Sequence, residues 1–102
     1  MKQAKHALLA AVLSCTVSVS AIAADAEKGK AKATICASCH GAQGISPSPL
    51  WPNLAGQKAP YLEKQLKAFR DGTRKDPMMG PMAKPLSDED IANISAYFAA
   101  MK

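Results

Sequence analysis

Apolar residues recur at helical spacing in three stretches of the chain, which are separated by two stretches without such a pattern. The recurring positions are Ala26, Gly29, Ala33 and Cys36; then Leu62, Leu66 and Phe69; and finally Ile91, Ile94, Phe98 and Met101. Positions three or four apart share one face of a helix, so each stretch predicts an amphipathic helix with one buried side. No stretch alternates as a half-buried strand would. The predicted fold class is therefore all-α.

The ends of these helices carry recognisable signals. Asp25 can cap a helix that begins at residue 24, and Pro60 suits the first position of the second helix, which Gly72 ends. The run from Ser87 to Asp90 predicts a capping box at the start of the last helix. We thus expect helices over residues 24–36, 60–71 and from Ser87 onward.

Glycine and proline break residues 41–57 and 72–86, which predicts two irregular loops. A loop as long as 41–57 is expected to be functional or wrapped around a ligand. Its apolar residues Trp51 and Leu54 are candidates for the wall of a ligand pocket. The loop 72–86 holds three methionines, Met78, Met79 and Met82.

The first 23 residues have the composition of a secretory signal peptide. A basic start with Lys2 and Lys5 precedes an apolar run that ends in the small-x-small sequence Ala21-Ile22-Ala23. Serine and threonine interrupt the run, which disfavours a transmembrane anchor. We therefore divide the chain into a cleaved signal peptide, residues 1–23, and one domain, residues 24–102, exported to the bacterial periplasm. An alternative is a lipid-anchored N-terminus at Cys15, for which Leu13 is a poor match.

A domain of this size gains little net stability from its own hydrophobic core, so we expect an additional stabilising element, such as a disulfide or a bound metal or cofactor. Its cysteines are Cys36 and Cys39, and the next residue, His40, is its only histidine. A disulfide across two residues would close too short a loop to stabilise much. A thioredoxin-like pair needs a βαβ unit, and structural zinc needs four ligands. The remaining hypothesis is covalent attachment of one haem at Cys-x-x-Cys-His.

The spacing of this motif suits haem. Cys36 and Cys39 are three residues apart, so on a helical turn both thiols reach the two vinyl groups along one haem edge. His40 then lies beneath the iron as the proximal ligand. With no second histidine in the domain, a methionine is the natural sixth ligand. Periodicity alone does not choose among Met78, Met79 and Met82.

Several motifs along residues 25–101 resemble those of class I c-type cytochromes. They are Cys36-Ala-Ser-Cys39-His40-Gly41, Pro52-Asn53-Leu54-Ala55-Gly56-Gln57, Tyr61-Leu62 with Gln65-Leu66, Met79 ahead of Leu86–Ile91, and Ala96-Tyr97-Phe98. The likeness is to the short soluble bacterial mono-haem kind, similar to one half of the di-haem members. It implies three to four helices wrapped around one haem, with the first and last helices packed crosswise.

The same resemblance implies roles for single residues. Met79 would be the distal iron ligand, Met82 a packing residue and Met78 its neighbour. Family members often use a proline carbonyl after the motif to accept a hydrogen bond from the proximal histidine, and Pro47 is the match we assign.

Two occupied axial positions leave no substrate site, which favours a one-electron carrier over an enzyme. Expected partners are redox proteins of a respiratory chain, a membrane-bound reductase and terminal oxidase or a periplasmic dehydrogenase. Alternatives are a haem subunit of a larger dehydrogenase or oxidase, and a gas-binding or peroxidase-like module with a labile methionine. The formal charge of +5 falls on loss of residues 1–23 and addition of two propionates, so nucleic-acid binding has no support. Basic residues cluster between Lys58 and Lys75, either as a solvated face or as a docking patch for acidic partners.

Overall fold

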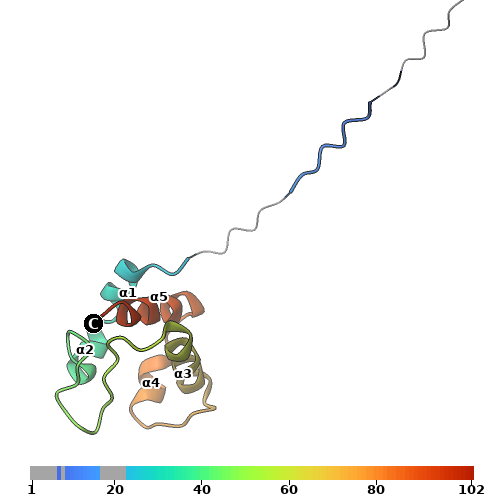
Figure 1. Ribbon diagram of the computed structural model, residues 1–102. Helices are drawn as coiled ribbons and strands as arrows, with labels where there is room; N and C mark the ends of the chain where they lie inside the picture. The colour runs from blue at the N-terminus through green and yellow to red at the C-terminus, as the bar shows by residue number, and fades with distance from the viewer. Residues whose placement is uncertain (1–6, 8, 17–22) are drawn as a thin grey trace, which may run out of the picture.

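The computed structural model describes residues 7, 9–16 and 23–102 of the chain, and these form an all-helical domain preceded by an extended segment (Figure 1). The predicted signal peptide falls mostly outside the described residues. The helices are α1 (Ala26–Lys32), α2 (Thr34–His40), α3 (Ala59–Asp71), α4 (Met79–Ala83) and α5 (Asp88–Ala99). No strand occurs in the described part, which confirms the predicted fold class. None of the helices described has the length and apolar character needed to span a membrane.

The first predicted helix is divided in two. Asp25 caps α1 as expected, because its carboxylate accepts hydrogen bonds from the N–H groups of Glu27 and Lys28. The helix ends at Lys32, and the carbonyl of the next residue, Ala33, accepts the Cys36 N–H at 2.9 Å in a tighter, three-residue turn. Helix α2 continues to His40 instead of ending at Cys36. The Cys-x-x-Cys-His motif therefore lies on a helix of its own.

The second irregular stretch contains a helix that the sequence analysis did not predict. Helix α3 ends at Gly72 as expected, with a φ of 81°. Within the loop that follows, the Asp76 carboxylate accepts hydrogen bonds from the N–H groups of Met78 and Met79 and so starts α4. With the division at Ala33, this gives five helices in the described residues instead of three to four.

Helix α5 begins as predicted. The Ser87 side chain accepts the Asp90 N–H at 3.0 Å, and the Asp90 carboxylate accepts the Ser87 N–H at 3.1 Å, which completes the capping box. The first and last helices pack closely, since a Cβ added at Gly29 would lie 1.9 Å from the Asn93 carbonyl oxygen. The Asn93 side chain also accepts the Asp25 N–H at 2.8 Å.

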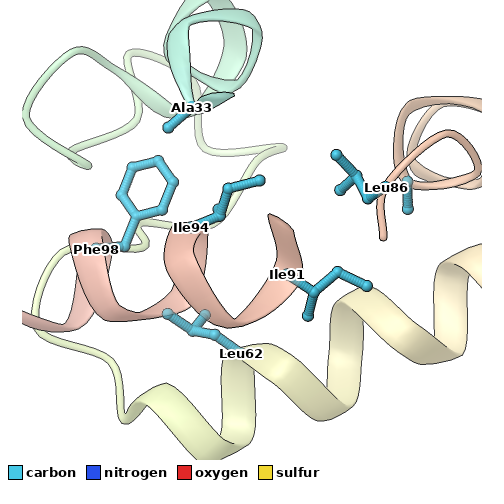
Figure 2. Close-up of a cluster of buried hydrophobic side chains, with 7 residues drawn as sticks. Ala33, Leu62, Leu86, Ile91, Ile94 and Phe98 are labelled. Carbon is cyan, nitrogen blue, oxygen red and sulfur yellow. The ribbon is translucent and has the colours of Figure 1, made fainter. Parts of the chain in front are cut away.

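The core is centred on α5 (Figure 2). Its buried apolar members are Ala33, Leu62, Ala83, Leu86, Ile91, Ile94 and Phe98. Figure 2 shows Ala33, which directly follows α1, and Leu62 of α3 approaching α5 from opposite sides. In Figure 1, α2 with the loop after it lies on one side below α5, and α3 with α4 lies on the other. The two segments that carry the candidate ligands thus face each other across the domain.

Candidate haem-binding site

Helix α2 places the three residues of the Cys-x-x-Cys-His motif within one turn of each other. Cys36 and Cys39 are free thiols, both half-buried. Burial raises the pKa of the Cys36 thiol, and the neighbouring Cys39 thiol adds to this effect. Within residues 7, 9–16 and 23–102, no group of three or more His, Cys, Asp or Glu side chains is arranged to hold a metal ion directly. These thiols therefore have neither a disulfide nor a zinc-type cluster to explain them.

His40 is buried, with 7% of its surface exposed. Its ring Nδ1 lies 2.7 Å from the carbonyl oxygen of Pro52. A carbonyl oxygen only accepts, so Nδ1 must carry the hydrogen, and Nε2 of the neutral ring keeps its lone pair. The hydrogen bonds of the described residues include none to Nε2. His40 is therefore a fixed tautomer whose Nε2 is available as a metal ligand.

The loop after α2 brings Pro52 back to His40. Gly41, directly after the histidine, has a φ of 86°, and a Cβ there would lie 1.9 Å from the Ile45 carbonyl oxygen. Further on, the carbonyl of Gly44 accepts hydrogen bonds from the N–H groups of Leu54 and Ala55 at 2.8 and 3.0 Å. These two bonds close the loop on itself. The segment that carries Pro52 is held beside α2 as a result.

The assignment of the histidine's acceptor to Pro47 was wrong, because the carbonyl that His40 contacts belongs to Pro52. Pro47 itself is exposed. Of the other two predicted pocket residues, Leu54 is half-buried and packs against the core cluster, as Cys36 does. Trp51 is half-buried but does not join that cluster. The structure thus packs Cys36 and Leu54 on the core and joins His40 to Pro52, and it leaves Pro47 exposed.

The three methionines differ in exposure. Met78 is 51% exposed and Met82 is 40% exposed, whereas Met79 is half-buried as the first residue of α4. The other end of α4 is anchored by Ala83, which is completely buried in the core. Sequence reasoning missed the role of Asp76, whose carboxylate holds the Met78 and Met79 N–H groups. An aspartate placed two residues before an N–H is a known turn former, so that signal was present.

The chemistry of this donor set fits haem. Two neighbouring thiols can form thioethers, an oriented imidazole nitrogen can bind iron, and a half-buried methionine on another segment offers a soft sulfur. The residues present are those that a covalently bound haem with two protein axial ligands requires.

The comparisons with known proteins agree with this chemistry. The cytochrome c family model matches residues 26–102. The chain belongs to the cytochrome c family. It is 49% identical over 83 residues to cytochrome c-554(548) of Halomonas halodenitrificans, a match that covers 78% of this chain and all of the relative. It is also 50% identical over 80 residues to cytochrome c4 of Pseudomonas aeruginosa, covering 78% of this chain and 40% of that one.

A solved structure gives the same result. The crystal structure of reduced recombinant cytochrome c4 from Pseudomonas stutzeri superposes with a TM-score of 0.74 and 44% sequence identity, covering 78% of this chain and 47% of that chain. The chain spans about half the length of the cytochromes c4 that it matches, so it corresponds to one half of a di-haem relative, as the resemblance implied. As a cytochrome c, it carries covalently bound haem c and transfers electrons instead of catalysing a reaction on a substrate.

Proposed function

We propose that the chain is a one-electron carrier of the bacterial periplasm in which Cys36 and Cys39 attach the haem while His40 Nε2 and Met79 Sδ bind its iron. The observation that carries this proposal is the hydrogen bond of 2.7 Å between His40 Nδ1 and the Pro52 carbonyl. It fixes the tautomer that a proximal ligand needs and leaves only Nε2 to bind. When bound, the haem supplies iron that alternates between the ferric and ferrous states.

Each residue of the chain has a distinct task in this proposal. The Pro52 carbonyl holds the His40 ring in one orientation and makes its Nε2 a stronger ligand for iron. The thioether sulfur of Met79 is a soft ligand, which favours the ferrous state and raises the reduction potential. Leu54, packed on the core, and Trp51 exclude water from the site and limit the reorganisation that accompanies electron gain.

Met79 is preferred over its two neighbours because it is the least exposed of the three methionines. With both axial positions taken, no open site remains for a substrate or a gas, so a carrier is favoured over a gas-binding or peroxidase-like module. Another relative is named a thiosulfate dehydrogenase electron acceptor. This name favours a periplasmic dehydrogenase as the electron donor of the chain. For the same reason, the second candidate function is that of a haem subunit within a larger dehydrogenase.

The test is to replace the methionines one at a time in the holo-protein. Met79→Ala should remove the ferric iron–sulfur charge-transfer band, lower the reduction potential and let the ferrous protein bind carbon monoxide. Met78→Ala and Met82→Ala are matched controls, and both should keep the band. A band that survives in Met79→Ala would refute the ligand assignment. Rapid carbon monoxide binding by the wild-type protein would refute the carrier function. Purification as a free monomer would argue against a dedicated subunit.

Export is part of the proposal, because haem is attached through thioethers outside the bacterial cytoplasm. The proposed cleavage site follows Ala23. The mass of the mature protein tests it directly, since cleavage there and lipid attachment at Cys15 give different masses.

A further inference from the structure

Two surface grooves lie along α3, and their charges differ. The first is lined mainly by Pro60, Glu63, Lys64, Lys67, Asp71 and Thr73. The second, which we call the α3–α4 groove, has a volume of about 530 Å³ and is lined mainly by Phe69, Arg70, Arg74, Lys75, Asp76 and Lys84. The first groove has two lysines and two acids, whereas the α3–α4 groove has four basic side chains and one acid.

Two of the charged groups in the α3–α4 groove are already engaged. Arg70 pairs with Asp71 at 2.8 Å and with Asp88 at 2.7 Å, so its charge is balanced. The Asp76 carboxylate accepts the hydrogen bonds of the Met78 and Met79 N–H groups. In contrast, Arg74, Lys75 and Lys84 form no ion pair with any described residue. These three unpaired cations outnumber the one carboxylate of the groove, Asp76, so the groove presents a surplus of positive charge.

Arg74 is held in position without a carboxylate partner. Its guanidinium carbon lies 4.4 Å from the centroid of the Phe69 ring, and its Nη1 donates to the Gln65 side-chain oxygen at 2.6 Å. Its backbone N–H also donates to the Ala68 carbonyl at 3.1 Å. An ordered arginine loses less side-chain entropy when a carboxylate binds to it. The remaining donors of Arg74 are thus prepared for an anionic group.

The α3–α4 groove also adjoins the proposed distal ligand. Asp76 and Pro77 precede Met79 and line the groove, as do Gly80 and Pro81, which follow it directly. A molecule seated in the groove would lie against the segment that carries Met79. The first groove is lined by residues 60–73 alone and has no such connection.

We propose that the α3–α4 groove is the docking site for an acidic segment of a protein redox partner, whose carboxylates pair with Arg74, Lys75 and Lys84. The proposal rests on the carrier function. Of the basic residues between 58 and 75, it assigns docking only to those at the C-terminal end of the cluster, and it adds Lys84. Charge complementarity supplies steering and orientation, while the apolar surface of Phe69 and Pro77 gives the segment a place to pack.

A matched pair of charge variants tests this assignment. R74Q/K84Q and K64Q/K67Q each remove two positive charges, the first from the α3–α4 groove and the second from the other groove. The probe is a hexaglutamate peptide, titrated at low ionic strength into the ferrous holo-protein labelled with ¹⁵N. Saturable amide shifts should map to residues 69–84. R74Q/K84Q should weaken binding by about tenfold, given that two exposed ion pairs are lost, and K64Q/K67Q by less than about twofold.

Several results would overturn the proposal. Equal weakening by the two variants would mean that net charge alone attracts the peptide. Shifts of the same size with inorganic sulfate at equal ionic strength would indicate a site for small anions, and tighter binding to anionic lipid vesicles would indicate a membrane surface. The charge-transfer band and reduction potential of each variant are recorded in parallel. Because neither groove variant replaces a proposed iron ligand, the charge-transfer band should stay as in the wild type even if the docking proposal fails.

Discussion

Replacing Gly29 by alanine should separate the first and last helices. The added Cβ would lie 1.9 Å from the Asn93 carbonyl oxygen and 2.4 Å from its carbonyl carbon, whereas Cβ contacts below 3.0 Å essentially do not occur. Both atoms belong to the backbone of α5, so no side-chain rotation can relieve the overlap. The two helices would have to move apart by more than about 1 Å, in a core that tolerates little displacement.

The size of the effect follows from two opposing contributions. Overpacking costs about 1–3 kcal/mol, and a clash between backbones belongs at the upper end. Alanine in place of glycine within a helix raises the free energy of unfolding by up to about 1 kcal/mol, because alanine has the higher helix propensity. We therefore expect a net loss of about 2 kcal/mol, which lowers the melting temperature of a domain this small by roughly 8–16 °C. Thermal unfolding of the holo-protein followed by far-UV circular dichroism measures it.

Gly80 provides the matched control for this substitution. It also lies in a helix, α4, but a Cβ added there meets nothing within 4 Å. Gly80→Ala should leave stability unchanged or raise it by up to about 1 kcal/mol. If Gly29→Ala melts within about 3 °C of Gly80→Ala, the close approach of α1 and α5 does not limit stability, and the reasoning is refuted.

Three further outcomes are expected. Asp76→Ala removes the acceptor of the Met78 and Met79 N–H groups, which should loosen the proposed methionine ligand. Imidazole added to the ferric protein should then bind the iron with roughly tenfold higher affinity than in the wild type. Asp71→Ala, which removes only a partner of Arg70, should leave the affinity for imidazole unchanged. The hydrogen bond from the Ser87 N–H lowers the pKa of the Asp90 carboxyl in the folded protein. The ionised carboxylate therefore stabilises the fold at pH values above the ordinary carboxyl pKa of about 4, and this contribution is lost as the pH falls through the lowered pKa of the folded protein. Unfolding followed against pH should therefore show a shallower acid limb in Asp90→Asn, and an unchanged limb would contradict this origin. Finally, the chain produced without haem should be largely unfolded, and a helical apo-protein that melts cooperatively would refute that expectation.

The parts of the fold that local signals determine could be predicted from the sequence. Asp25, Gly72 and the Ser87–Asp90 box each act within a few residues, and each caps its helix as expected, although α1 begins at Ala26 and not at residue 24. The division at Ala33 had no such signal, because Ala33 is buried in the core and its turn depends on tertiary packing. Helix α4 could not be predicted in the same way, because the prolines and glycines of residues 72–86 predict an irregular loop. Pro81 lies in the first turn, where its missing N–H has no intrahelical partner to lose.

The candidate site divides in the same way. The Cys-x-x-Cys-His motif defines its chemistry by adjacency alone, so Cys36, Cys39 and His40 could be named from the sequence. The carbonyl that accepts the His40 hydrogen bond could not be named from the sequence. Residues 41–57 contain three prolines, and nothing in the sequence distinguishes their carbonyls as acceptors. The two hydrogen bonds to the Gly44 carbonyl close the loop and select Pro52, a choice that depends on the folded loop and not on spacing.

The distribution of the core is the physical reason for expecting that the fold depends on haem. The largest fully buried apolar side chains, Ile91, Ile94 and Phe98, all lie on α5. The segments that carry the proposed ligands reach this core through Cys36 and Leu54, which are half-buried, and through Ala83 and Leu86. We expect these few contacts to bury too little apolar surface to order α2, the long loop and α4 against their conformational entropy. A covalent haem bound from both sides would join these segments, so the residues that set its electronic properties are also those whose order depends on it.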